Sequence, residues 1–264
     1  IYEVTGIRIP LAKKMLLSNR VRRRLRTTGI EGFDAYLRLL KSLKPNDPEW
    51  DAFLQEITTH ETYLFRDEVQ WDWFRKDYLG EIAAAARRGE RKQELRIWSA
   101  AASTGDEAHT IAACIADGLP QCDQWKIQIV GTDIGIEAIE HAKAGVYGER
   151  AMRLVPEPMK RRLFETVAGQ NLWKAKPKIK QWLSFRQHNL MDPMTERPFD
   201  LVFVKNVLIY FDRDSKQVVI KNLRKVLAQG GLLVAGAAEG ISDLLDGMER
   251  IQPWLYRQTN LPIR

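Results

Sequence analysis

The sequence predicts an α/β fold, in which a mostly parallel β-sheet is covered by helices and is preceded by a small helical domain. Two patterns predict the sheet and its helices: short, almost continuous apolar runs after about residue 90, and helix-like stretches that alternate with them. A third pattern, the helical spacing of apolar residues near the N-terminus, predicts the helical domain. The 264 residues, 45% of them hydrophobic, suffice for one sizeable core and a small added module.

The first predicted helix begins at Pro10, which can occupy a first helical position, and ends at Gly29. Apolar residues recur between them at every fourth position, at Leu17, Val21 and Leu25. This spacing places them in one stripe along the helix.

Two shorter helical patterns follow, and we assign residues 1–57 to a basic helical domain. The sheet domain is assigned to residues 58–264, and its first element is a long helical stretch over residues 68–87. Four apolar runs predict its strands: Leu95–Ala100, Ile127–Thr132, Leu201–Lys205 and Leu232–Ala237. A basic, hairpin-like stretch predicts a small inserted β-subdomain at about residues 165–186.

The net charge of +7 is concentrated at the N-terminal end of the sequence. Residues 1–50 contain eleven Lys and Arg against five Asp and Glu, whereas the remainder is nearly neutral. Such a segment favours an acidic partner: a nucleic acid, an anionic lipid surface or an acidic protein surface. Four of its cations, Lys13, Arg20, Arg23 and Arg24, gather on one flank of the first predicted helix. A solvated, solubilising face is the alternative interpretation.

Several classes of protein and site are not expected. No apolar run is long enough to span a membrane, and the first residues lack the charged start and apolar stretch of a signal peptide. Cys114 and Cys122 form no CxxC pair and the four histidines are scattered, so neither a metal site nor a disulfide framework is expected. This cysteine usage is typical of the reducing cytoplasm.

Polar residues follow the predicted strands at the edge where open α/β sheets bind ligands. After the first strand, a loop of small residues over 99–105 leads into a helix that begins with Asp106 and Glu107. Small residues allow the backbone to approach a ligand closely, and the carboxylates attract a cationic group such as an amine. A tight turn whose carboxylates complement the helix dipole is the alternative.

Asp133 follows the second strand, where a carboxylate can accept hydrogen bonds from ribose hydroxyls; a helix cap is the alternative. Lys205, Asn206 and Tyr210 follow the third strand, and such groups line a pocket more often than they fill a core, although Tyr210 alone also suits an ordinary packed position. Upstream of the sheet, polar groups stand among aromatic ones in ITTHETYLFRD. From its residues alone, this segment is best interpreted as a capped helix start.

Taken together, these segments resemble the chemotaxis receptor glutamate methyltransferase family, often called CheR. The resemblance begins with the basic N-terminal helix and with ITTHETYLFRD, which corresponds to TTN-x-T-x-FFR in the family. In the sheet domain, RIWSAAASTGDEAHTIA corresponds to W-S-A-x-x-S-T-G-E-E-P-Y-S, and IVGTDIGIEAIEHAKAGVY to S/T-D-I-D followed by A-x-x-G-x-Y. Further along, HNL corresponds to the family's N-L pair, and FDLVFVKNVLIYFD to FD-x-I-x-C-R-N-V-x-I-Y-F-D. The resemblance implies a Rossmann-like S-adenosylmethionine-dependent methyltransferase sheet with an N-terminal all-helical domain. It also implies protein-glutamate O-methylation of chemoreceptors, without a metal and with S-adenosylhomocysteine as product.

The resemblance implies a role for each matching residue. The cofactor-binding set comprises His60, Thr62, Arg66, Glu107, Asp133, Asn189, Leu190, Lys205 and Asn206. Within it, Glu107 is expected to bind the methionine ammonium and Asp133 the ribose. Arg66, Lys205 and Tyr210 are expected to be catalytic, the two cations by holding the incoming carboxylate and the hydroxyl by orienting it.

The implied partner is an acidic helical region of a chemoreceptor, which Lys13, Arg20, Arg23 and Arg24 are expected to bind. In some members of the family the β-subdomain also docks a receptor's C-terminal peptide. No nucleic acid is expected, because no cluster of stacking aromatic residues stands beside Lys205-Asn206.

Three departures from the family pattern keep alternatives open. His60 stands where the family usually has Asn, Lys205 where it has Arg, and GAAEGI where it has G-H-S-E-N. Because Arg and Lys are not interchangeable for bidentate contacts with a carboxylate, a cofactor-binding module without turnover is one alternative. A nucleic-acid methyltransferase, favoured by the basic N-terminus, is the other.

Overall fold

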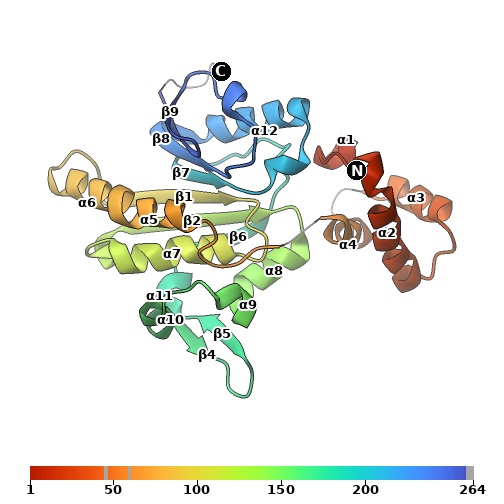
Figure 1. The fold of residues 1–264 in the computed structure, drawn as a ribbon, viewed down its shortest axis with the longest axis horizontal. Coiled ribbons are helices and arrows are strands. Elements are labelled where there is room, and N and C mark those ends of the chain that lie inside the picture. The colour runs from red at the N-terminus through yellow and green to blue at the C-terminus, as the bar shows by residue number, and fades with distance from the viewer. Residues whose placement is uncertain (45–46, 59–60, 260–264) are drawn as a thin grey trace.

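The computed structural model describes residues 1–44, 47–58 and 61–259. The elements that it describes in the N-terminal part are all short helices or helical turns (Figure 1). The elements there are α1 (Tyr2–Thr5), a 3₁₀ turn (Leu11–Lys13), α2 (Lys14–Thr28), α3 (Phe33–Ser42) and α4 (Pro48–Ile57).

The first predicted helix is confirmed, and the expected residues define its ends. Pro10 precedes the 3₁₀ turn that leads into α2, and Gly29 ends α2 in the left-handed region, at φ 72°. The apolar stripe of α2 packs against a small core that contains Tyr36, Phe53 and Leu54. This core joins α2, α3 and α4 into one unit.

A seven-stranded mixed sheet forms the second part of the molecule and confirms the predicted α/β class. The strand order is β6 (Leu183–Gln187), β2 (Lys126–Asp133), β1 (Glu94–Ala100), β7 (Phe199–Val204), β8 (Leu227–Ala235), β10 (Leu255–Gln258) and β9 (Met248–Gln252). The first five strands are parallel, and β10 pairs antiparallel with both β8 and β9.

Helices cover both faces of this sheet (Figure 1). They are α5 (Glu68–Trp73), a π-helical turn (Phe74–Tyr78), α6 (Leu79–Arg87), α7 (Asp106–Gly118), α8 (Ile136–Ala144) and α12 (Arg213–Lys225). The run from α5 to α6 confirms the predicted long helical stretch and, with α7, packs on the face that carries Leu95 and Ile97. α12 packs on the opposite face, which carries Trp98.

The inserted β-subdomain differs in extent from the predicted range of 165–186. Its sheet has the order β3 (Val146–Gly148), β5 (Leu172–Ala175) and β4 (Phe164–Thr166), with the short helices α9 (Glu149–Met152), α10 (Glu157–Leu163) and α11 (Pro177–Lys180) beside it. It therefore begins upstream of residue 165, whereas residues 183–187 pair with β2 in the large sheet. Those residues alternate between partly buried and exposed, because β6 is an edge strand with one face open to solvent. The strands of an isolated hairpin show the same alternation, which is why the sequence predicted a hairpin here.

The chain reverses direction across the sheet at β1. It runs from β1 outward to β2 and then β6, and afterwards crosses to β7 on the other side of β1. The loops after β1 and β7 therefore leave the sheet in opposite directions and open a crevice at its carboxyl edge, where open α/β sheets bind ligands.

Candidate active site

A pocket lies at the carboxyl ends of β1, β2, β6 and β7. The predicted residues that line it are Thr62, Arg66, Glu107, Asp133, Asn189, Leu190, Lys205, Asn206 and Tyr210. His60 lies outside the described residues. The fold thus brings side chains from five separate stretches of sequence to one crevice.

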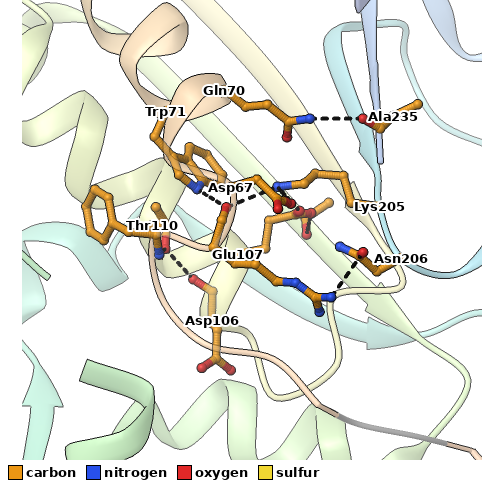
Figure 2. Close-up of polar contacts among 12 residues, drawn as sticks. Asp67, Gln70, Trp71, Asp106, Glu107, Thr110, Lys205, Asn206 and Ala235 are labelled. Atoms are coloured by element: carbon orange, nitrogen blue, oxygen red, sulfur yellow. Dashed lines mark hydrogen bonds and ion pairs between the residues drawn. The ribbon is translucent and has the colours of Figure 1, made fainter. Parts of the chain in front are cut away.

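The Lys205 ammonium is buried at the end of β7, between two carboxylates (Figure 2). Its Nζ lies 3.1 Å from Asp67 Oδ2 and 3.8 Å from Glu107 Oε2, and it donates to the Arg66 carbonyl at 3.3 Å. The same Nζ lies 4.9 Å from the centre of the Trp71 ring. With its side chain 3% exposed, Lys205 depends on these groups to replace water around its charge.

The Glu107 carboxylate lies in the first turn of α7 and lines the pocket. It accepts a hydrogen bond from the Ser99 hydroxyl at 2.7 Å. Burial raises the pKa of Glu107, while Lys205 and the Ser99 hydroxyl partly offset the effect and Arg66 acts more weakly. Within the described part of the chain, Glu107 shares its ion-pair partner Lys205 with Asp67, so salt bridges do not fully compensate the carboxylates here, which favours a cationic ligand group.

Asp133 ends β2 with its carboxylate facing the pocket. One oxygen accepts a hydrogen bond from the Ser103 amide at 2.8 Å, and the other from the Gly135 amide at 3.0 Å. Each carboxylate oxygen has two lone pairs. The backbone contacts therefore fix the orientation of the carboxylate and leave it able to accept two hydroxyl donors from a ligand.

Arg66 spans the segment before α5 and the loop after β7. Its Nη2 donates to Asn206 Oδ1 at 3.1 Å, and its Nη1 donates to the Glu61 carbonyl at 2.9 Å. Its Cζ lies 5.8 Å from the centre of the Tyr63 ring. These contacts hold a guanidinium in the pocket wall with donors to spare.

Left-handed backbone conformations gather around the pocket. The non-glycine residues concerned are Phe65, Asp67, Ala101, Ser103 and Asn206, with φ between 51° and 66°. Within the described ranges one further case, Gln121, lies elsewhere. Each such conformation costs about 1–3 kcal/mol and persists where the surroundings hold it in place. Their clustering indicates that, around this crevice, the backbone adopts unfavourable conformations in order to place particular side chains.

Glu239, which the sequence analysis did not select, anchors the loop after β7. It is 1% exposed and accepts hydrogen bonds from the backbone amides of Asn206 and Ile209, the latter at 3.1 Å. Burial raises its pKa, and the backbone hydrogen bonds offset part of that rise. The available signal was the single glutamate in the otherwise small and apolar GAAEGI.

The N-terminal segment forms a further wall that the sequence did not predict. Thr5 and Ile7 line the pocket, and Ile7 forms an antiparallel bridge with Phe211. The Asn189 side chain donates to the Val4 carbonyl at 2.7 Å and so attaches this segment to the loop after β6. No motif in the first residues signals this contact, because it depends on backbone groups.

Two of the four predicted substrate-binding cations are half-buried against other parts of the helical domain. The Arg24 guanidinium binds both oxygens of Glu49, at 2.5 and 3.1 Å, and Tyr36 donates to the same carboxylate at 2.5 Å. Arg20 donates to the Ile57 carbonyl at 2.7 Å. Both side chains therefore link α2 to α4.

The other two predicted cations remain on the surface. Lys13 is exposed, and the side chain of Arg23 is 54% exposed although it pairs with Glu56 at 2.8 Å. An ion pair this exposed contributes little to stability and exchanges readily with an external carboxylate. Lys13 and Arg23 are thus the members of the set that an incoming partner can reach.

The described part of the chain shows neither a metal-ligand cluster nor a membrane-spanning helix. Residues 1–44, 47–58 and 61–259 contain no group of three or more His, Cys, Asp or Glu side chains placed to hold a metal ion. Over the same residues, no helix combines the length and apolar character needed to cross a membrane.

Comparison with known proteins relates this chain to a family. The sequence matches the model of the CheR methyltransferase all-alpha domain over residues 1–58 and that of the CheR methyltransferase SAM binding domain over residues 60–253. Among solved structures, the N-methyltransferase NodS from Bradyrhizobium japonicum WM9 in complex with S-adenosyl-l-homocysteine has a TM-score of 0.41 and 16% identity, covering 72% of this chain and 92% of that one.

Two relatives align with more than nine-tenths of this chain. The chemotaxis protein methyltransferase of Escherichia coli (strain K12) is 34% identical over 249 residues, which cover 92% of this chain and 82% of that protein. The corresponding protein of Salmonella typhimurium (strain LT2) is 33% identical over 250 residues, with 93% and 82% coverage. The two family models and these identities lead to one conclusion: the chain belongs to the CheR methyltransferase family.

Proposed function

We propose that this protein uses S-adenosylmethionine to esterify glutamate side chains of a chemoreceptor. One observation carries the proposal: a single pocket at the switch point of the sheet combines Glu107, Asp133, Arg66 and Tyr210. These side chains supply a carboxylate for an ammonium, a carboxylate for a ribose, a cation for a substrate carboxylate and a hydroxyl. Membership of the CheR family supports the assignment.

The cofactor fits the donor set of the pocket. We assign Glu107 to the methionine ammonium, because its side chain is only 16% exposed and shares its ion-pair partner with Asp67. We assign Asp133 to the ribose hydroxyls, because its backbone contacts leave one lone pair free on each oxygen. Leu190 and Asn189 flank the adenine in this arrangement, and Thr62 lies at the amino-acid end.

The reaction depends on aligning the substrate carboxylate with the methyl group more than on acid–base catalysis. S-adenosylmethionine supplies an electrophilic methyl group on a sulfonium. A glutamate side chain, with a reference pKa of about 4.3, is already an anionic nucleophile at neutral pH. The tasks left to Arg66 and Tyr210 are to orient that carboxylate in line with the methyl group and to exclude water, which together lower a barrier by several kcal/mol.

Lys205 takes a different role from the one that the family resemblance suggested. Its ammonium is surrounded by Asp67, Glu107 and the Arg66 carbonyl, and its side chain is 3% exposed. We therefore assign the incoming carboxylate to Arg66 and give Lys205 the positioning of Glu107. Replacement of the family's arginine by lysine is compatible with this role. A compact ammonium can sit between two carboxylates without the planar, bidentate geometry of a guanidinium.

For the protein partner, we propose that α2 and the 3₁₀ turn before it bind an acidic helix of the receptor, through Arg23 and Lys13 respectively. Both side chains are exposed, whereas Arg20 and Arg24 are half-buried against α4. The net positive charge of residues 1–50 attracts a glutamate-rich helix from a distance.

We also propose that the β-subdomain docks a receptor C-terminal peptide. β3 and β4 are the two edges of its three-stranded sheet. An extended peptide can add to such an edge through backbone hydrogen bonds.

Asp133→Ala should weaken S-adenosylhomocysteine binding at least tenfold, or about 1.4 kcal/mol. The change removes both of the acceptors assigned to the ribose. Isothermal titration calorimetry measures the affinity, with exposed Asp123→Ala as the matched control and thermal unfolding to confirm that both variants fold. Unchanged affinity in Asp133→Ala would exclude this residue from the cofactor site.

Acidification should weaken cofactor binding. The loss should begin at a higher pH than it would if Glu107 had the pKa of an ordinary glutamate. Because burial raises the pKa of Glu107, its carboxyl becomes protonated before normal glutamates do and then no longer attracts the ammonium. Titrations with S-adenosylhomocysteine between about pH 5 and 8 test this. Glu107→Gln should bind weakly across the range, without the acid-dependent loss; an equal pH dependence in both proteins contradicts the assignment.

Arg66→Ala and Tyr210→Phe should each lower kcat about tenfold or more while changing cofactor affinity less, because their contacts strengthen mainly in the transition state. The assay uses tritiated S-adenosylmethionine and receptor-containing membranes, with base-labile label as the readout. Exposed Arg87→Ala on α6 is the control. Parallel losses of rate and affinity would reassign both residues to cofactor binding. An inert wild type that still binds cofactor would favour a module without turnover.

The double variant Lys13→Gln with Arg23→Gln should raise the KM for receptor, most strongly at low ionic strength where surface charges are least screened. Arg24→Ala serves as the contrast, because loss of its bidentate pair with Glu49 should lower the unfolding temperature. If the double variant methylates receptor normally but loses affinity for DNA or RNA, the receptor assignment of α2 is wrong.

A further inference from the structure

Two arginines of the inserted region stand beside the pocket mouth and were not part of the predicted site. Arg150 lies in α9, and Arg153 follows that helix directly. The backbone joins them to the pocket wall, because the Leu64 amide donates to the Ala151 carbonyl at 3.1 Å. Both arginine side chains are exposed.

Tyr63 connects these arginines to the active site. Its ring lines the pocket, and the Arg153 guanidinium carbon lies 3.4 Å from the ring centre. The Arg66 guanidinium carbon lies 5.8 Å from the same centre. The two guanidiniums are therefore no more than 9.2 Å apart, the sum of these distances. One aromatic ring thus holds an inner cation at the pocket and an outer cation at the surface.

The charges of the two outer arginines are balanced differently. Arg150 forms an ion pair with Glu61. Arg153 donates a hydrogen bond to the Arg150 carbonyl, and among residues 1–44, 47–58 and 61–259 no carboxylate lies within salt-bridge distance of it. An exposed guanidinium stacked on an aromatic ring retains its outer donors for a carboxylate.

A substrate helix matches the spacing of this pair. Side chains three or four residues apart lie on one face of a helix, with about 5–6 Å between their Cβ atoms. Two carboxylates one turn apart can therefore contact two cations that are separated by less than 9.2 Å. Arg66 contacts the reacting glutamate and Arg153 the second carboxylate.

We propose that Arg153 is a specificity-determining residue, which binds an acidic side chain one helical turn from the glutamate that is methylated. The inference rests on the proposed function, because it takes an acidic helix as substrate and places the reacting carboxylate at Arg66. It adds a selection rule: acceptor glutamates with an acidic neighbour at position i−4 or i+4 are preferred.

The test uses Ala-rich helical peptides that contain one acceptor glutamate. Aspartate or asparagine stands at i−4 or at i+4, so the charge changes while the shape is kept and no second glutamate is present. Wild type, Arg153→Gln, Arg153→Lys and the control Arg161→Gln are compared by kcat/KM for transfer of tritiated methyl groups, with mass spectrometry to locate the ester. Arg161 is a suitable control, because it is 81% exposed and lies on α10.

Wild type and Arg161→Gln should prefer the aspartate peptide at one of the two positions by about fivefold, the upper end for an exposed ion pair. In Arg153→Gln the ratio should fall to about one, and Arg153→Lys should keep part of it. The inference is overturned if wild type does not distinguish aspartate from asparagine at either position. It is equally overturned if Arg161→Gln loses the preference as Arg153→Gln does.

A binding measurement separates this inference from the proposed reaction. Fluorescence anisotropy with the labelled peptides and S-adenosylhomocysteine-saturated protein reports the aspartate preference without turnover. If no peptide is methylated but Arg153→Gln abolishes the preference in binding, the proposed reaction fails and the role of Arg153 stands. If binding also shows no preference, both are wrong.

Discussion

The buried Lys205 ammonium is the constraint on which the site depends, because three separate segments of the chain meet at it. Lys205 comes from the end of β7, Glu107 from the first turn of α7, and Asp67 from the residues before α5. A buried charge without partners is strongly destabilising, so each segment restrains the other two. The carboxylate that we assign to the cofactor ammonium is therefore oriented before any ligand binds. The same contacts explain why the Lys205 side chain is only 3% exposed although it borders the pocket.

The loop that carries Asn206 and Tyr210 is held from two further directions. Glu239, which belongs to the sheet domain, accepts hydrogen bonds from two backbone amides of this loop. The N-terminal segment meets the end of the same loop through Ile7, and Thr5 completes the pocket wall. These contacts offset the strain of the left-handed conformation at Asn206. They also make residues 1–7 part of the pocket wall, so the surface that we propose as receptor-binding is joined directly to the pocket.

The parts of the fold that the sequence predicted are those with a local signal. The strand predicted at Leu95–Ala100 forms as Glu94–Ala100, because a parallel strand buried on both faces is apolar along its length. The edge strand Leu183–Gln187 was instead taken into the hairpin, because one exposed face gives it an alternating pattern. The terminal hairpin of β9 and β10 was missed for a related reason: exposed residues interrupt both strands. Asp133 and Glu107 were selected because carboxylates at the end of a strand, or at the start of the helix that follows one, have a short list of uses.

The sequence by itself determined the helical domain, the four inner strands of the sheet, the polar residues near their ends and the family of the chain, because these features depend on neighbours along the chain. Tertiary structure alone decided which charges are available. Arg24 belongs to a basic run, yet Glu49 of another helix engages it. Arg153, which stands in no motif, is stacked on Tyr63 beside the pocket and left with free donors. The free energy of a charge depends on the partners and the solvent around it, and segments distant in sequence supply those partners.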